Sequence, residues 1–113
     1  RTADLVFLAK LYRTLLASTI DSGFKSNELH TKLGLSKSQA YRKILSLTDM
    51  APNQLIQEFR LRQSLRAIMQ QDQTIAEIGY GLGFNSPSYF TKVFQKRFRL
   101  TPTSFAKKQA GKE

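Results

Sequence analysis

Hydrophobic residues recur every three or four positions along almost the whole chain, the spacing that places them on one face of an α helix. Nowhere do four or more residues alternate between apolar and polar side chains within turn-forming boundaries, as they do in a half-buried strand. The pattern therefore predicts an all-α fold, and the turn signals divide it into seven helices.

The first predicted helix runs from about residue 3 to residue 20 and ends at the turn Asp21-Ser22-Gly23. Its apolar residues recur at helical spacing and form a stripe. We expect this stripe to face the core, and it consists of Leu5, Leu8, Tyr12, Leu15 and Thr19 or Ile20.

Two helices joined by a glycine are predicted next. Ser26 is expected to cap a short second helix that stops at Gly34, with Leu29 and Leu33 pointing inward. Ser36 followed by Gln39 is a capping box, in which the serine hydroxyl accepts an amide proton and the glutamine reaches back. This box opens a third helix that runs to about residue 47. Its inward residues are Ala40, Ile44 and Leu47.

A long fourth helix is predicted from Pro52 to about Gln70, because a proline in the first helical position loses no hydrogen bond. Ala51 before it is a poor cap. We expect this helix to link two parts of the chain over residues 52–71. The side chains available for packing on it are Leu55, Phe59, Leu65, Ile68 and Met69.

Three shorter helices are predicted after residue 71. Thr74 with Glu77 is a second capping box, and the helix that it opens ends in Gly81-Leu82-Gly83. A sixth helix follows Ser86-Pro87, and a seventh follows Thr101-Pro102. The sixth carries Phe90, Phe94 and Phe98 on its core face, the fifth carries Ile75, Ile78 and Leu82, and the tail from Gln109 to Glu113 is expected to fray.

The sequence contains one unit twice. At an offset of 49, Leu29, Leu33 and Gly34 match Ile78, Leu82 and Gly83; after one inserted residue, Ser36 matches Ser86, Ser38 matches Ser88, Arg42 matches Lys92, Ile44 matches Phe94 and Pro52 matches Pro102. Each unit is a short helix, a glycine turn, a serine cap and a longer helix with basic residues. That order is typical of a helix-turn-helix motif, whose second helix enters the DNA major groove. We expect a first motif in residues 1–51 and a second in residues 72–113.

The helix between the two units is expected to act as a spacer. Residues 53–70 would span roughly 27 Å at ~1.5 Å per residue. Together with the flanking units, this brings the two candidate recognition helices, about residues 37–47 and 87–97, near the ~34 Å that separates successive major grooves on one face of B-DNA. One chain would then bind two adjacent grooves.

The charge of the chain favours the same partner. The 18 Lys and Arg residues against 8 Asp and Glu give a net charge of +10, and residues 85–113 carry seven basic residues against Glu113 alone. The hydrophobic fraction of 41% predicts a folded chain despite this charge. Non-specific binding to nucleic acid or to an anionic surface is the alternative, because the net charge alone would produce it.

The sequence lacks the residues that several classes of function require. It has no cysteine and one histidine, which excludes disulfide scaffolds, thiolate zinc sites and multi-histidine metal sites. It also shows no nucleophile-base pair and no phosphate loop, so we expect neither an enzyme nor a cofactor. No apolar run approaches the ~20 residues that cross a bilayer, and the start at Arg1 resembles no signal peptide. We expect a soluble part of a longer protein.

The chain resembles the DNA-binding domain of the AraC/XylS family of bacterial transcription regulators over essentially its whole length. The resemblance rests on LGLSKSQAYRK at residues 33–43, RLR at 60–62, and IAEIGYGLGFNSPSYFTKVFQK at 75–96 with Thr101-Pro102 after it. The third segment is highly specific to the family. FLAK at residues 7–10 and SQAYRK at 38–43 look most like the output domain of two-component regulators, including hybrid histidine kinases.

This resemblance implies partners for the domain and for the full-length protein. They are double-stranded DNA, RNA polymerase, and an upstream sensory or receiver and dimerisation domain. No metal and no membrane contact by this domain are implied. The location would be cytoplasmic, with a membrane anchor elsewhere in the full-length protein if it is a hybrid histidine kinase.

The sequence departs from the family pattern at several positions. Asp49 and Arg99 stand where glycine usually follows each recognition helix, and arginine tolerates left-handed backbone less well than aspartate. Ala40 replaces a larger aliphatic residue, which leaves the first unit less filled. Gly79 and Gly81 replace residues with side chains and weaken the fifth helix by up to about 1 kcal/mol each. We expect a marginally stable or flexible domain.

Arg42 is the main candidate for reading a base, because its planar guanidinium can donate to O6 and N7 of guanine together. The alternatives are a phosphate contact or a pair with a carboxylate such as Glu77. Lys92 holds the matching place with a point charge and should discriminate less sharply. The full set of predicted base contacts is Ser38, Tyr41, Arg42, Pro87, Ser88, Thr91 and Lys92; of these, Ser38 and Tyr41 match base-reading positions of similar proteins, and Tyr41 could equally pack.

Phosphate contacts fix the register of a protein on DNA without reading its sequence. The residues predicted to make them are Ser36, Lys37, Lys43, Asn85, Ser86 and Lys96. The remaining basic residues near the C-terminus are interpreted as solvating that end of the domain. His30 is interpreted as a partly buried or surface histidine, since no second ligand lies near it in the sequence.

Overall fold

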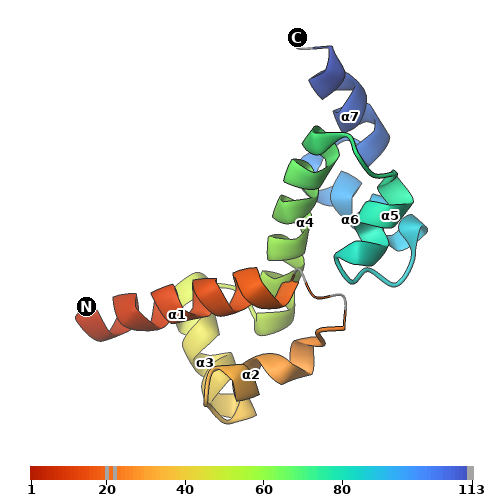
Figure 1. Cartoon of the computed structure of the whole chain (residues 1–113). Helices are drawn as coiled ribbons and strands as arrows, with labels where there is room; N and C mark the ends of the chain where they lie inside the picture. The colour runs from red at the N-terminus through yellow and green to blue at the C-terminus, as the bar shows by residue number, and fades with distance from the viewer. Residues whose placement is uncertain (20, 22, 112–113) are drawn as a thin grey trace. The chain divides into compact units, whose positions relative to one another are not determined.

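A computed structural model describes residues 1–19, 21 and 23–111 (Figure 1). Within them the chain forms seven α helices, one short 3-10 helix and no strand, which confirms the all-α prediction. The elements are α1 (Thr2–Thr19), η1 (Ser26–Glu28), α2 (Leu29–Lys32), α3 (Lys37–Thr48), α4 (Pro52–Gln70), α5 (Ile75–Gly81), α6 (Pro87–Phe98) and α7 (Pro102–Ala110). Residue 20 of the first predicted helix, Ser22 of its turn, and residues 112–113 of the tail lie outside the described residues. The prediction that the tail frays from Gln109 is wrong for its first two residues, because Gln109 and Ala110 end α7.

Two compact units divide the chain, Arg1–Phe59 and Arg60–Glu113, and their boundary falls inside α4. Each unit has its own hydrophobic core. The buried residues of the first core are Leu11, Leu15, Phe24, Leu29, Leu33, Ala40, Ile44, Leu55 and Ile56. Those of the second core are Leu61, Ile68, Ile78, Phe84, Phe90 and Phe94.

The buried face of α1 agrees with the predicted one only in part. Leu15 and Thr19 are buried as predicted, and Leu11 is buried as well, whereas Leu5 and Tyr12 are 67% and 56% exposed. Leu8 is half-buried against the first core. Apolar residues of α1 occupy more than one face of the helix, so periodicity alone does not select which face the core covers.

The second predicted helix is divided into the 3-10 helix η1 and the α helix α2. Ser26 is the first residue of η1 and not a cap, and the amide of Lys25 before it donates to Oε1 of Glu28 at 3.4 Å. Leu29 and Leu33 are buried, as predicted.

α4 begins at Pro52 and ends at Gln70, as predicted. The weak cap at Ala51 is partly replaced, because the side chain of Gln54 accepts the Ala51 amide proton at 2.9 Å. A capping box has two hydrogen bonds, and this is the one in which the side chain of the third helical residue accepts the amide proton of the cap residue. The other is missing, because alanine has no hydroxyl to accept the amide proton of the third residue.

The packing along α4 differs from the prediction. Met69, which the sequence predicts to pack, is 54% exposed, while Ile56 and Leu61 are each only 2% exposed. Ile56 belongs to the first core and Leu61 to the second. A helix that contributes to two cores does not carry one apolar stripe, so a single helical period does not describe it.

The turn of the first unit is closed by two backbone hydrogen bonds. The amide of Gly34 donates to the carbonyl of Thr31, and that of Leu35 donates to His30, both at 3.0 Å. Gly34 has a φ of +71°, the left-handed conformation that this way of ending a helix requires.

The turn of the second unit repeats these bonds 49 residues later. The amide of Gly83 donates to the carbonyl of Tyr80, and that of Phe84 donates to Gly79, again at 3.0 Å. Gly83 has a φ of +93°. The predicted repeat is therefore present in the hydrogen bonds of the backbone as well as in the sequence.

α3 and α6 both end on a residue in the left-handed conformation that is not glycine. Asp49 has φ 60° and Arg99 has φ 70°, and each amide donates to a carbonyl four residues earlier, at 2.9 Å to Leu45 and 2.8 Å to Gln95. The helices thus end as they would with glycine. The strain expected at Arg99 is retained, since this backbone costs roughly 1–2 kcal/mol outside glycine.

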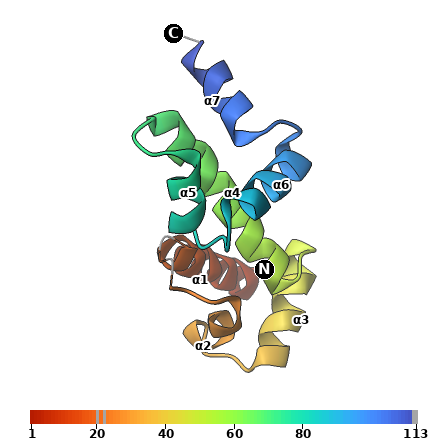
Figure 2. The same ribbon diagram turned by 90° about the vertical axis from the view of Figure 1, so that its right-hand side faces the viewer.

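Gly79 allows α5 and α6 to approach closely. A Cβ atom at this position would lie 2.9 Å from Cδ2 of Phe90, whose ring is fully buried. α5 contacts α6, and the two helices lie side by side in Figure 1; in the turned view of Figure 2 they are drawn on either side of the α4 ribbon. The packing of the second core therefore depends on the absence of a side chain at Gly79. This glycine lowers the helix propensity of α5, but it also makes room for the Phe90 ring.

We expect Gly79→Ala to destabilise the second unit by on the order of 1–3 kcal/mol, because the buried Phe90 ring has to shift. This loss opposes the gain of about 1 kcal/mol that alanine brings within a helix. Gly81→Ala is the matched control, since its Cβ would have nothing within 4 Å. It should raise the free energy of unfolding by up to about 1 kcal/mol. Urea unfolding followed by circular dichroism measures both, and a gain in both variants would contradict the close packing.

Candidate nucleic-acid interface

One face of α3 presents a row of exposed side chains. Ser38, Tyr41, Arg42 and Leu45 lie at i, i+3, i+4 and i+7, so they share one side of the helix. All four are exposed, while Ala40 on the opposite side is buried in the first core. The predicted base-reading side chains of this helix are therefore accessible together.

α6 presents a matching row. Ser88, Lys92 and Gln95 are exposed, as expected for the first two, whereas Pro87 and Thr91 are half-buried. Gln95 is not among the predicted contacts, although it follows Lys92 by three positions and Thr91 by four. Helical spacing alone would have included it.

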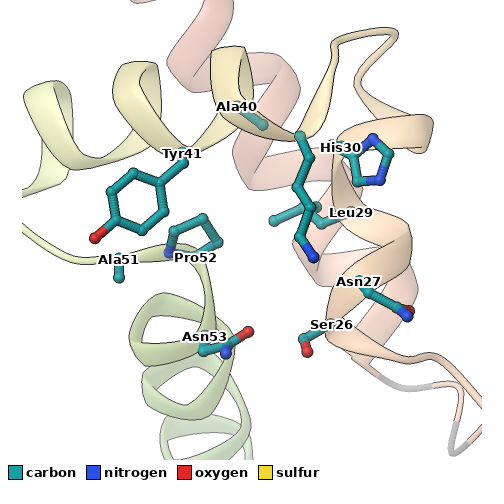
Figure 3. Close-up of a pocket in the computed structure, with 10 residues that line it drawn as sticks. Ser26, Asn27, Leu29, His30, Ala40, Tyr41, Ala51, Pro52 and Asn53 are labelled. Atoms are coloured by element: carbon teal, nitrogen blue, oxygen red, sulfur yellow. The ribbon is translucent and has the colours of Figure 1, made fainter.

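Tyr41 combines the two alternatives left open for it. Its side chain is 49% exposed, and its ring lies beside Pro52 at the start of α4 (Figure 3). The tyrosine thus packs against its own unit and still presents surface to a partner.

Two predicted phosphate contacts are helix caps. Oγ of Ser36 accepts the amide proton of Gln39 at 3.2 Å, and Oγ of Ser86 accepts that of Tyr89 at 3.1 Å. A hydroxyl that accepts one hydrogen bond still carries its own proton to donate. Each serine can therefore hold the start of its helix and donate to an anion at the same time. Asn85, next to the second cap, is exposed.

The predicted lysine contacts differ in their surroundings. Lys37 and Lys96 are exposed at the surface of their helices. Nζ of Lys43 lies 4.7 Å from the centre of the Phe7 ring, within the range of a cation–π contact. Nothing in the spacing of the sequence connects α1 with this lysine, so the contact was not predicted.

Arg60 lies beneath the turn of the second unit. Its Cζ would be 3.0 Å from a Cβ atom at Gly83, and burial lowers the pKa of its guanidinium. The positive φ of Gly83 favours glycine at this position, and a side chain there would also crowd Arg60. This contact gives a structural role to the first arginine of the RLR segment.

The side chain of His30 forms a hydrogen bond with the backbone of the turn in the first unit. Its Nδ1 lies 3.1 Å from the carbonyl oxygen of Leu35. Because a carbonyl only accepts, Nδ1 carries the proton of this hydrogen bond. In the part of the chain that is described, no three potential metal-binding side chains gather in one place. Among those residues, no helix combines the length and apolarity that crossing a bilayer needs.

Comparison with known proteins gives this arrangement a family context. A family model described as a helix-turn-helix domain matches residues 29–108. Histidine kinase P4 of Formosa agariphila is 32% identical over 102 residues, which cover 90% of this chain and 7% of the kinase. The chain therefore spans only a small part of the length of this relative.

Solved structures share the fold. A transcriptional regulator from Chromobacterium violaceum, described as an AraC-type DNA-binding domain-containing protein, matches with a TM-score of 0.87 at 20% identity and covers 100% of both chains. The DNA-binding domain of AdpA, solved in complex with a target DNA, matches with a TM-score of 0.83 at 23% identity. That match covers 94% of this chain and 95% of the AdpA chain.

We expect Ser86→Ala to lower the stability of the second unit by about 1 kcal/mol in the absence of any ligand, because it removes the cap of α6. Ser88→Ala is the control; Ser88 is exposed on the same helix and should change stability by no more than about 0.5 kcal/mol. Urea unfolding measures both. Equal stability of the two variants would contradict the capping role of Ser86.

Proposed function

The chain belongs to the AraC-type helix-turn-helix family, and from this premise we propose that it is a sequence-specific double-stranded DNA-binding domain that regulates bacterial transcription. The family is one of DNA-binding transcription regulators and not of enzymes.

The duplicated turn carries this proposal. Each unit has a left-handed glycine between two helices, a serine cap, and a second helix with an exposed polar row. The cap and the glycine fix the direction of the second helix, and the opposite face of that helix is anchored in the core. A helix held in this way can present a fixed set of side chains to the edges of bases in a major groove.

We assign the direct reading of bases to the exposed rows. Arg42 would take guanine through two hydrogen bonds, and Gln95 adds a side-chain amide that can pair with N6 and N7 of adenine. The proposed base contacts are Ser38, Tyr41, Arg42, Pro87, Ser88, Thr91, Lys92 and Gln95. The proposed phosphate contacts are Ser36, Lys37, Lys43, Asn85, Ser86 and Lys96.

The two recognition helices are proposed to enter adjacent major grooves. The presence of two complete units in one chain supports this, because a helix-turn-helix dimer reads two half-sites about one helical turn apart. In this division residues 1–51 and 72–113 each supply one motif, and residues 52–71 link them.

For the full-length protein we propose the output domain of a two-component regulator in the cytoplasm. The 32% identity to a histidine kinase supports this. An upstream sensory or receiver domain would supply the input, and RNA polymerase would be the partner in transcription. A membrane anchor elsewhere in the protein is compatible with this arrangement.

Arg42→Ala should weaken binding to a selected operator fragment by about 1–3 kcal/mol and relax the preference at one base position. The loss arises because the bidentate pair with guanine disappears. Arg42→Lys keeps the charge without the planar fork and is the matched control, which should retain affinity for scrambled duplex. Competition gel shifts with single-base operator variants measure the effect.

The result also separates the proposal from its alternative. Equal affinity of the unmodified chain for operator and scrambled duplex at physiological salt would indicate non-specific binding and overturn the proposal. A loss in Arg42→Ala that is uniform across all sequences would make Arg42 a phosphate contact and remove it from the base-reading set.

A further inference from the structure

The first unit contains a pocket of about 300 Å³, to which the function proposed above assigns no ligand (Figure 3). Residues of η1 and α2, of α3, and of the start of α4 line it. Its floor and walls are Leu29, Ala40, Ala51, Pro52 and the ring of Tyr41, and its polar side chains are Ser26, Asn27, His30, Lys37 and Asn53. This volume lies at the lower end of the range of small-molecule sites.

The pocket lies at a pair of positions where the two units carry their large and small residues in opposite order. In the second unit, Gly79 on α5 leaves room for the buried ring of Phe90 on α6. In the first unit the matching residues are His30 and Ala40, so the large side chain is on the first helix and the small one on the second. His30 is held by its hydrogen bond to Leu35, and Ala40 cannot fill the space that a phenylalanine would occupy. Both residues line the pocket.

The lining selects a class of ligand. Lys37 supplies a cation, and none of the lining residues that the structure describes is acidic. Asn53 at the start of α4 adds a side-chain amide with two donors. An apolar floor beside a cation and amide donors suits a ligand with a small apolar body and one negatively charged end.

We propose that this pocket binds a small organic monocarboxylate with a flat apolar body of about one ring, and that its occupation competes with DNA. The apolar body lies on the floor formed by Leu29, Ala40 and Pro52, beside the Tyr41 ring. The carboxylate is bound by Lys37 and the amide of Asn53. No bond is made or broken.

The carboxylate and DNA are expected to compete because both would contact the same residues, and this step rests on the proposed function. Lys37 and Tyr41 line the pocket and also belong to the proposed DNA contacts. A carboxylate on Lys37 neutralises a charge that would otherwise meet a phosphate. If the two ligands exclude one another, the apparent Kd for DNA rises by the factor one plus the ligand concentration over its own Kd.

Binding is tested first without DNA, with benzoate as the probe. Benzoate should shift the NMR signals of the Asn27 and Asn53 side-chain amides and of the His30 ring in a saturable manner, with a Kd in the millimolar range expected for so small a ligand. Benzamide lacks the charge and acetate lacks the ring, so neither should saturate at the same concentrations. Absence of saturable shifts with benzoate, or equal shifts with all three compounds, overturns the proposal.

The matched variants are Asn53→Asp and Gln54→Glu. Both add one negative charge to the first turn of α4, but only Asn53 lines the pocket. Gln54 accepts the Ala51 amide proton, and glutamate keeps that acceptor. Asn53→Asp should weaken benzoate binding at least tenfold and Gln54→Glu less than threefold, with circular dichroism showing that both fold. Equal weakening would mean that only the overall charge matters and would contradict a site.

The DNA arm uses the selected operator at constant ionic strength. Benzoate at about nine times its Kd should raise the apparent Kd for DNA about tenfold, while acetate at the same concentration should leave it unchanged. Saturable benzoate binding with an unchanged Kd for DNA overturns the competition. If the chain shows no preference for the operator even without benzoate, the proposed function fails instead. The NMR titration with benzoate does not depend on that function, so the two failures can be told apart.

Discussion

The left-handed glycine between the two helices of each unit is the constraint on which the rest of the structure depends. Gly34 and Gly83 end one helix and turn the chain, and a serine two or three residues later starts the next. In the second unit a Cβ atom at Gly83 would also approach the guanidinium of Arg60 to 3.0 Å. The core can anchor one face of the following helix only if this turn sets its direction, and the opposite, polar face is then presented outward.

The positions of the helices were largely predictable, because capping residues and prolines close to each helix end in the sequence determine where it begins or ends. Ser36 with Gln39 and Thr74 with Glu77 form the capping boxes that the sequence predicts, and Pro52 starts the long helix. Which face is buried was less predictable. The buried side of α1 and the exposure of Met69 depend on what packs against each helix, and periodicity does not encode the partner.

The interface shows the same division. Exposure of Arg42 and Lys92 follows from helical spacing, and so would that of Gln95. The contact of Lys43 with Phe7 does not, because it joins residues far apart in the sequence. The role of Gly79 also appears only in three dimensions: its absent side chain makes room for a core ring, whereas helix propensity alone describes it as a weakness. The exchange of large and small residues between the units likewise accounts for the pocket beside Ala40 in the first unit.

The central claim of this account is that one chain carries two units that read DNA together. Hydroxyl-radical footprinting of the selected operator, with the chain shown to be a monomer by sedimentation, tests it most directly. We predict two protected patches on one face of the duplex, with centres about 10–10.5 base pairs apart. A single protected patch of one half-turn, at a concentration that saturates the operator, would contradict the claim.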